Sequence, residues 1–230
     1  MSKAILTIDD VPEKVTPQMI DYLSEMNINA VMFAQGDKMV QAPEIINYAI
    51  QRGIVIGNHS YSHPFFSKLS LEEGIEEIER TEELIEVAYE RARVRRRAKL
   101  FRFPYLDKGG DYKSAFQRYL TERGFNRIDD SGVESAGYKE RGWNLDRDIT
   151  CSYDCREYET HDGSITFDDV FRFMDEGDAG MKSNLFTDRG THIILLHSHD
   201  QSEQILPGYY KKMIGYMLQH GVDFIVPHFV

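Results

Sequence analysis

Cysteine is nearly absent from this sequence, which excludes a fold held together by disulfides. Cys151 and Cys155 are the two cysteines in 230 residues, and neither has a second Cys or a His nearby at zinc-finger spacing. We therefore expect two free thiols. A chain of this length can hide on the order of 70% of its surface on folding, so an apolar core should supply the stability.

Two further absences exclude whole classes of protein. No apolar run approaches the ~20 residues that a membrane-spanning helix needs. Basic residues are outnumbered, with 27 Lys and Arg against 38 Asp and Glu and a net charge of −11, whereas nucleic-acid-binding proteins usually carry a basic excess. A strand-like run follows Met1 almost at once, so the pattern of a signal peptide is missing. We expect a cytoplasmic protein with no membrane span and no nucleic-acid partner.

The sequence does contain a regular alternation of strand-like and helix-like segments. This order is typical of a parallel sheet covered by helices. Since no repeat, linker or low-complexity segment divides the chain, we expect a single α/β domain over residues 1–230, closed as a barrel or doubly wound. The strand-like runs are Ala4–Ile8, Ala30–Phe33, Ile54–Ile56, Leu100–Phe103, His192–Leu196 and Asp223–Val226.

Helix signals lie between these runs. Ser70 and Glu73 have the spacing of a capping box and open the longest amphipathic stretch. The apolar spacing of three to four residues predicts further helices. They are expected from Thr16 onward and over 43–51, 112–123, 167–174 and 209–219, whereas 124–162 has no regular pattern.

Four of the strand-like runs end in unusual polar groups. These are Asp9-Asp10, the segment from Asn58 to His63, the segment from Arg102 to Tyr105 and the segment from His197 to Asp200. In parallel α/β architectures the carboxyl ends of the strands meet at one edge, where reactive groups gather. Because charged and imidazole groups are costly to crowd together without a metal or substrate, we interpret the four clusters as one candidate site.

Two histidines and one carboxylate from these clusters form a metal-binding set. His59 and His63 are four residues apart, a spacing that places two imidazoles on the same side of a turn. One carboxylate from Asp9 or Asp10 completes a catalytic zinc site with three protein ligands and an open position for water. The other carboxylate could accept a proton from that water, whose pKa the metal lowers to about 7.

His197 offers the complementary acid. Hydrolysis of an amide expels an amine that must be protonated, and a His kept charged by neighbouring acids can do this. His199 lies two residues further on and competes for the same role. The other four histidines lack such companions and are interpreted as ordinary surface or partly buried residues: His161, His192, His220 and His228.

Four ordered motifs span most of the chain. They are Leu6-Thr7-Ile8-Asp9-Asp10 with Pro12, His59-Ser60-Tyr61-Ser62-His63-Pro64, Arg102-Phe103-Pro104-Tyr105 and Leu195-Leu196-His197. Together they resemble the motifs of the polysaccharide deacetylases, the NodB-homology enzymes of carbohydrate esterase family 4. The similarity runs from Leu6 to about His199 in the family's unpermuted order.

The resemblance implies a distorted (β/α) barrel with mostly parallel strands that removes N-acetyl groups from amino sugars. It implies a carbohydrate substrate and a divalent metal, with Zn²⁺ expected and Co²⁺, Ni²⁺ or Fe²⁺ as alternatives. A metal-bound water would attack the amide carbonyl. Carried over by position, Asp10, His59 and His63 would bind the metal. Asp9 would be the general base, held in position by Arg102, and His197 would be the general acid. The backbone N–H of Tyr105 would stabilise the oxyanion.

The chain departs from the family's pattern in two places. Val11 stands where the first motif usually has Gly, and a β-branched residue there is expected to narrow the groove or to forbid a glycine conformation. The fourth motif is normally Asp-x-x-Asp-Trp, and we expect its counterpart within 143–149, with its last Asp paired to Arg102. Asp148 is the expected partner, and Asp146 is the alternative.

Three other functions stay open at this point. The same fold and metal could hydrolyse another amide, such as a formyl group on a sugar-lipid or a cyclic ureide or imide. A catalytically silent sugar-binding module has no need of both Asp9 and His197. A two-His-one-carboxylate iron oxygenase uses the same ligand types, but an extra acid beside the ligand suits hydrolysis better.

Overall fold

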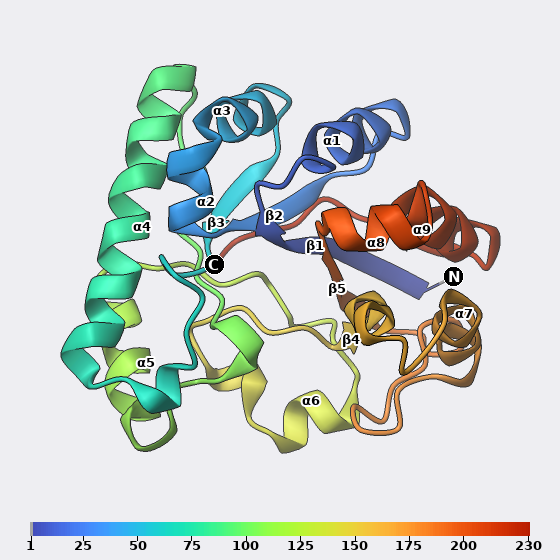
Figure 1. Ribbon diagram of the computed structural model, residues 1–230. Helices are drawn as coiled ribbons and strands as arrows, with labels where there is room; N and C mark the ends of the chain where they lie inside the picture. The colour runs from blue at the N-terminus through green and yellow to red at the C-terminus, as the bar shows by residue number, and fades with distance from the viewer. Residues whose placement is uncertain (1) are drawn as a thin grey trace.

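A six-stranded sheet forms the centre of the computed structural model, which describes residues 2–230 (Figure 1). The strand order is β3-β2-β1-β5-β4, β6 runs beside the N-terminal end of β1, and all of these pairings are parallel. The predicted α/β fold with parallel strands is therefore confirmed. The strands are β1 (Ser2–Val11), β2 (Ala30–Ala34), β3 (Val55–Asn58), β4 (Tyr153–Asp154), β5 (Thr191–His197) and β6 (Val222–Phe224).

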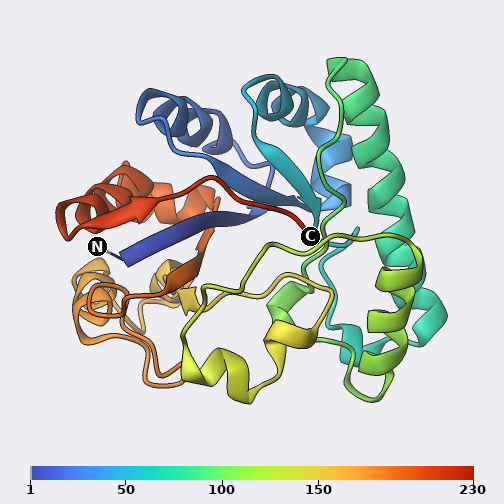
Figure 2. The same ribbon diagram turned by 180° about the vertical axis from the view of Figure 1, so that it is seen from behind.

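Helices surround the sheet, as the two opposite views show (Figures 1 and 2). All six predicted helices are present, and the Ser70–Glu73 capping box forms as expected. Three short helices, α2, α6 and α8, are not predicted by the pattern. The bounds are α1 (Thr16–Glu25), α2 (Gly36–Gln41), α3 (Pro43–Gln51), α4 (Leu71–Ala92), α5 (Lys113–Glu122), α6 (Ala136–Glu140), α7 (Phe167–Glu176), α8 (Asp200–Ile205) and α9 (Tyr209–Gln219).

Irregular segments close the sheet into a distorted barrel. The Leu100–Phe103 run, expected to be a strand, contributes a single bridge in which the backbone N–H of Asn58 donates to the Leu100 carbonyl at 2.8 Å. The N–H of Ile149 in turn donates to the Phe101 carbonyl at 2.8 Å, and the chain then enters β4. Main-chain hydrogen bonds thus run around the ring from β3 to β4 without a full strand at this position.

Side chains of β1 alternate between the two faces of the sheet. Leu6 and Ile8 pack outward in the cluster that includes α1 and α9, whereas Ile5 packs with the inward-facing residues of the neighbouring strands. A register shift between Ile8 and Val11, with φ of 66° at Asp10, interrupts this period of two. Both aspartates at the end of β1 can therefore line one pocket, although a regular strand would point them apart.

A cluster of buried aromatic rings includes Phe103, which belongs to the predicted polar segment from Arg102 to Tyr105. Phe101 and Phe103 alternate with Arg102 and pack edge to face at 4.7 Å between ring centroids. Phe66 and Phe116 complete the contact, and Pro104, which has no N–H, ends the extended run. The rings leave Arg102 facing inward, toward the end of β1.

Cys151 and Cys155 are buried free cysteines. Within residues 2–230, no helix combines the length and the apolar content required to cross a bilayer.

Two helical glycines should respond in opposite ways to alanine. At Gly74 in α4 an added Cβ would meet Phe116 Cε1 at 2.7 Å and Phe66 Cδ1 at 3.2 Å, whereas Gly215 in α9 faces open space. We expect Gly215→Ala to raise the free energy of unfolding by up to about 1 kcal/mol, the difference in helix propensity. Gly74→Ala should lower it by about 1 kcal/mol or more, because overpacking outweighs that gain. Urea denaturation measures both, and a stabilising Gly74→Ala would contradict the packing described here.

Candidate active site

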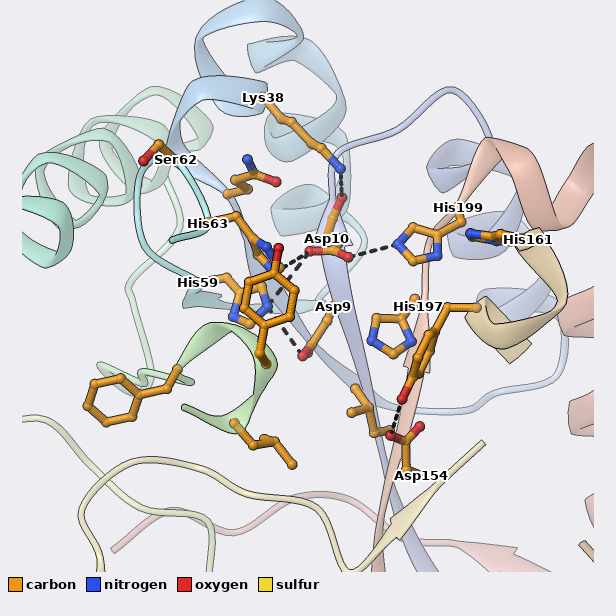
Figure 3. A pocket seen from close by; sticks show the side chains of 16 residues that line it. Asp9, Asp10, Lys38, His59, Ser62, His63, Asp154, His161, His197 and His199 are labelled. Atoms are coloured by element: carbon orange, nitrogen blue, oxygen red, sulfur yellow. Dashed lines mark hydrogen bonds and ion pairs between the residues drawn. The ribbon is translucent and has the colours of Figure 1, made fainter. Parts of the chain in front are cut away.

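The polar clusters predicted from the strand ends line one pocket. Its volume is about 650 Å³, and it opens at the carboxyl ends of β1, β3 and β5 (Figure 3). Asp9 and Asp10 come from β1, His59 and His63 follow β3, and His197 ends β5. The structure therefore brings together residues that are almost 190 positions apart in the sequence.

Asp10, His59 and His63 have the geometry of a metal-binding set. One ligand atom from each lies within 4.8 Å of the other two. Asp10 Oδ1 is 3.2 Å from His63 Nε2 and 3.7 Å from His59 Nε2, and this buried oxygen has no hydrogen-bond donor among residues 2–230. A cation placed among the three groups would supply the missing partner.

The protonation states of the histidines also fit a cation. His59 Nδ1 must donate to the Arg102 carbonyl, 2.9 Å away, so the neutral ring has its lone pair on Nε2, which faces Asp10. Burial, with a smaller contribution from the His59 charge, lowers the pKa of His63 to about 4, so this ring is neutral at pH 7. Two imidazole nitrogens and a carboxylate form a donor set that suits a divalent metal such as zinc.

The turn between the two histidines is not helical. Ser60 and His63 both have positive φ, 64° and 58°. The turn is held by side chains, since the Ser60 N–H donates to Asn58 Oδ1 at 2.9 Å and the His63 N–H donates to the Ser60 hydroxyl at 3.2 Å. The i, i+4 spacing therefore brings the imidazoles together through a loop, with ring centroids 4.9 Å apart.

Asp9 is paired with a fully buried arginine. Arg102 Nη1 donates to Asp9 Oδ1 at 2.7 Å and to the Thr7 hydroxyl at 2.9 Å, and its Nε donates to the Ile149 carbonyl at 3.1 Å. The other oxygen, Asp9 Oδ2, lies 3.5 Å from His59 Nε2 on the pocket side. The carboxylate is thus anchored through one oxygen and presents the second.

The expected pairing of Arg102 with Asp148, or alternatively with Asp146, is wrong. Asp148 accepts hydrogen bonds from Lys108 Nζ at 2.8 Å and from Gln117 Nε2 at 2.6 Å. Asp146 accepts from the same Lys108 at 2.7 Å. A buried lysine that the sequence analysis did not consider therefore satisfies both acids, and Asp9 is the carboxylate partner of the arginine.

His197 is held by an acid that the sequence analysis missed. Glu157 Oε1 accepts from His197 Nδ1 at 2.9 Å and from its backbone N–H at 2.6 Å. Burial opposes the charged ring, yet the charge and hydrogen bond of Glu157 raise the pKa of His197 to about 10. The segment from Asp154 to Tyr158 has the spacing of Asp-x-x-Asp-Trp, with Glu for the second Asp and Tyr for Trp, so this spacing was the available signal.

Two more histidines reach the pocket (Figure 3). His199 Nε2 lies 2.7 Å from Asp10 Oδ2, so this nitrogen is already engaged, which disfavours the competing assignment of His199 as the acid. His161 also lines the pocket, 5.0 Å from His199 between ring centroids. It belongs to the irregular region 124–162, where the sequence offered no pattern that could place it.

Val11 does not narrow the groove. Its side chain is fully buried in the core cluster, and the positive φ falls on Asp10. Tyr105 does line the pocket, with φ of 56° and 57% of its surface exposed. Its ring stacks on Phe65 at 4.0 Å and contacts the ring of His63 edge-on at 4.5 Å.

Comparison with known sequences finds related proteins. The profile of the family described as polysaccharide deacetylase matches residues 2–127. A peptidoglycan-N-acetylglucosamine deacetylase from Bacillus cereus is 36% identical over 85 residues, which is 36% of this chain and 31% of that protein. Chitin deacetylase 1 from Cryptococcus neoformans is 37% identical over 73 residues, 32% of this chain and 16% of that protein. Each alignment thus spans less than a third of the relative's length.

Solved structures extend the likeness to the whole fold. The crystal structure of a polysaccharide deacetylase from Bacillus cereus aligns with a TM-score of 0.66 and 19% sequence identity. The alignment covers 99% of this chain and 93% of that one. At this identity the likeness establishes the barrel architecture.

Glu157 should control the charge of His197. In the metal-free protein we expect NMR titration to find His197 protonated at pH 7, because its pKa is raised to about 10. Glu157→Gln removes the paired charge and should lower this pKa by about 1–3 units. Glu159→Gln is the matched control, since Glu159 pairs with Arg156 instead. A His197 that titrates near the ordinary value of about 6.5 in the unmodified protein would contradict the assignment.

Proposed function

This chain belongs to the polysaccharide deacetylase family, and on that premise we propose that it is a metal-dependent hydrolase that removes N-acetyl groups from an amino-sugar substrate. The observation that carries the proposal is that the pocket with the candidate cation site also contains a carboxylate paired with an arginine and an imidazole paired with a glutamate. Asp9 is held by Arg102, and His197 is held by Glu157. A protein that only binds sugar has no use for this pair.

Asp10, His59 and His63 are the residues that would hold the metal, and zinc suits their donor atoms. When bound, a divalent cation supplies Lewis acidity, which polarises the amide carbonyl and makes water a stronger acid. Burial opposes the charge on Asp10, but the hydrogen bond with His199 and the nearby imidazoles hold its pKa well below the usual value. This carboxylate is therefore charged, as a ligand must be.

Asp9 is the proposed general base. Its Oδ1 is occupied by the guanidinium of Arg102, so a proton taken from water has one place to go, the pocket-facing Oδ2. The buried ion pair fixes the carboxylate in one orientation, which suits proton transfer over hydrogen-bond distance. Water adds to the carbonyl carbon as its proton passes to Asp9.

His197 is the proposed general acid. Glu157 occupies Nδ1, which leaves the Nε2 proton for the departing nitrogen. As the C–N bond breaks, this proton converts the leaving group to a free amine, and acetate is the second product. The backbone N–H of Tyr105 is the proposed donor to the developing oxyanion, and the turn at Pro104–Leu106 carries it at the pocket wall.

The substrate class follows from the relatives and the pocket. The two relatives described above are named as deacetylases of peptidoglycan N-acetylglucosamine and of chitin. We propose that residues 1–230 act as one catalytic domain, because β6 and β1, from opposite ends of the chain, pair in the same sheet. The departure at Val11 gave a reason to consider other amides, and its burial in the core removes that reason.

Asp9→Asn should abolish turnover and spare metal binding. The amide keeps the shape of the carboxylate but cannot accept the proton, so we expect acetate release from N-acetylglucosamine oligomers to fall by about 10²–10⁴-fold. Asp168→Asn, at an exposed position on α7, is the control and should match the unmodified enzyme. Turnover by Asp9→Asn at the original rate would refute the proposed base, and binding of the oligomers without turnover by the unmodified protein would favour the sugar-binding module.

Activity should depend on a metal and not on oxygen. Chelation is expected to reduce acetate release to background, and added Zn²⁺ should restore it equally in air and under anaerobic conditions. His63→Ala should prevent the recovery, whereas His220→Ala, which removes a distant exposed imidazole, should not. A requirement for oxygen would favour the iron oxygenase instead.

A further inference from the structure

The candidate metal ligand Asp10 has a third imidazole neighbour, His199, which the proposed reaction does not use. His199 Nε2 lies 2.7 Å from Asp10 Oδ2, while Oδ1 of the same carboxylate faces His59 and His63 (Figure 3). Since a carboxylate oxygen accepts, His199 donates from Nε2. The two oxygens of Asp10 are therefore directed to different partners on opposite sides.

We propose that His199 is a positioning residue, which holds the Asp10 carboxylate in the orientation that a metal ligand requires. The proposal rests on the metal site of the proposed function. A carboxylate attached through a single bond can rotate, and a donor fixed on one oxygen limits that rotation. His199 therefore acts on the cation through Asp10.

The backbone of Asp10 is held as well. Its φ of 66° lies in the left-handed region, which is costly for a residue other than glycine. Lys38 Nζ donates to the Asp10 carbonyl at 3.1 Å and also contacts Glu13 Oε1 at 2.6 Å. With the main chain fixed by Lys38 and one carboxylate oxygen fixed by His199, the remaining Oδ1 has a defined direction toward the two imidazoles.

The His199 ring is itself immobilised, as a positioning residue needs to be. Its backbone N–H donates to the Tyr209 hydroxyl at 3.1 Å. Its ring stacks on His197 with centroids 5.1 Å apart and an angle of 16° between the planes, and His161 lies beside it at 5.0 Å. Packing against His197 and His161, together with the main-chain hydrogen bond to Tyr209, thus fixes the position of the donating Nε2.

The test compares two variants of similar size that differ in the donor. His199→Phe keeps a ring to stack on His197 but cannot donate, whereas the amide of His199→Gln extends about as far as the imidazole Nε2 and restores an N–H. Zinc affinity is measured directly by competition with a chromophoric chelator. We expect His199→Phe to bind Zn²⁺ about 10–100-fold more weakly. His199→Gln should recover most of the loss, which a purely structural role of the ring would not produce.

His197→Phe is the matched control, because it removes the other ring of the stacked pair. It should lose acetate release, as expected for the proposed acid, and keep the zinc affinity of the unmodified protein. Equal zinc affinity in His199→Phe and the unmodified protein would overturn the inference while leaving the proposed function intact. Failure of the unmodified protein to bind zinc would instead overturn the proposed function.

A measurement on the unmodified protein covers the case in which neither His199 variant folds. In the zinc-loaded, nitrogen-labelled protein, NMR should find the proton of His199 on Nε2 and protected from exchange with water. A ring protonated only on Nδ1, or an Nε2 proton that exchanges freely, would overturn the inference.

Discussion

The buried guanidinium of Arg102 is the constraint on which the site depends. Its side chain is fully buried, and it orients two functional groups at once. The guanidinium fixes one oxygen of Asp9, and the main-chain carbonyl of the same residue fixes the tautomer of His59. Because a buried charge left without its partner costs about 3–5 kcal/mol, the end of β1 and the segment at 100–103 must stay in register for the protein to be stable.

This constraint explains why the closing segment of the barrel is irregular. Phe101 and Phe103 are directed into the aromatic cluster, and Arg102 between them is directed into the barrel. One bridge to β3 and one hydrogen bond from Ile149 satisfy the main chain there. The segment at 100–103 places the guanidinium of Arg102 inside the barrel, and the longer parallel strands β1 and β5 form the regular part of the sheet.

Periodicity predicted a parallel α/β domain, the family resemblance predicted its closure as a barrel, and the strand ends predicted the residues of the candidate metal set. Asp9 and Asp10 lie at the end of β1 and His59 follows β3, and parallel strands bring their carboxyl ends to one edge. Pairings among buried polar groups could not be predicted this way. Asp148 and Glu157 both lie in the irregular region, and whether an acid meets Arg102, Lys108 or His197 depends on how that loop folds back.

The rim of the pocket is built differently from its floor. Tyr105 lines the pocket, is half-exposed and stacks on the half-exposed Phe65, whereas Asp10 and His59 are buried and held by hydrogen bonds. Tyr105 connects the two levels, because its ring stacks on Phe65 and also contacts the ring of His63 edge-on, with centroids 4.5 Å apart. Because one tyrosine touches both an outer aromatic ring and an imidazole of the candidate site, the shape of the opening and the position of that imidazole cannot change independently.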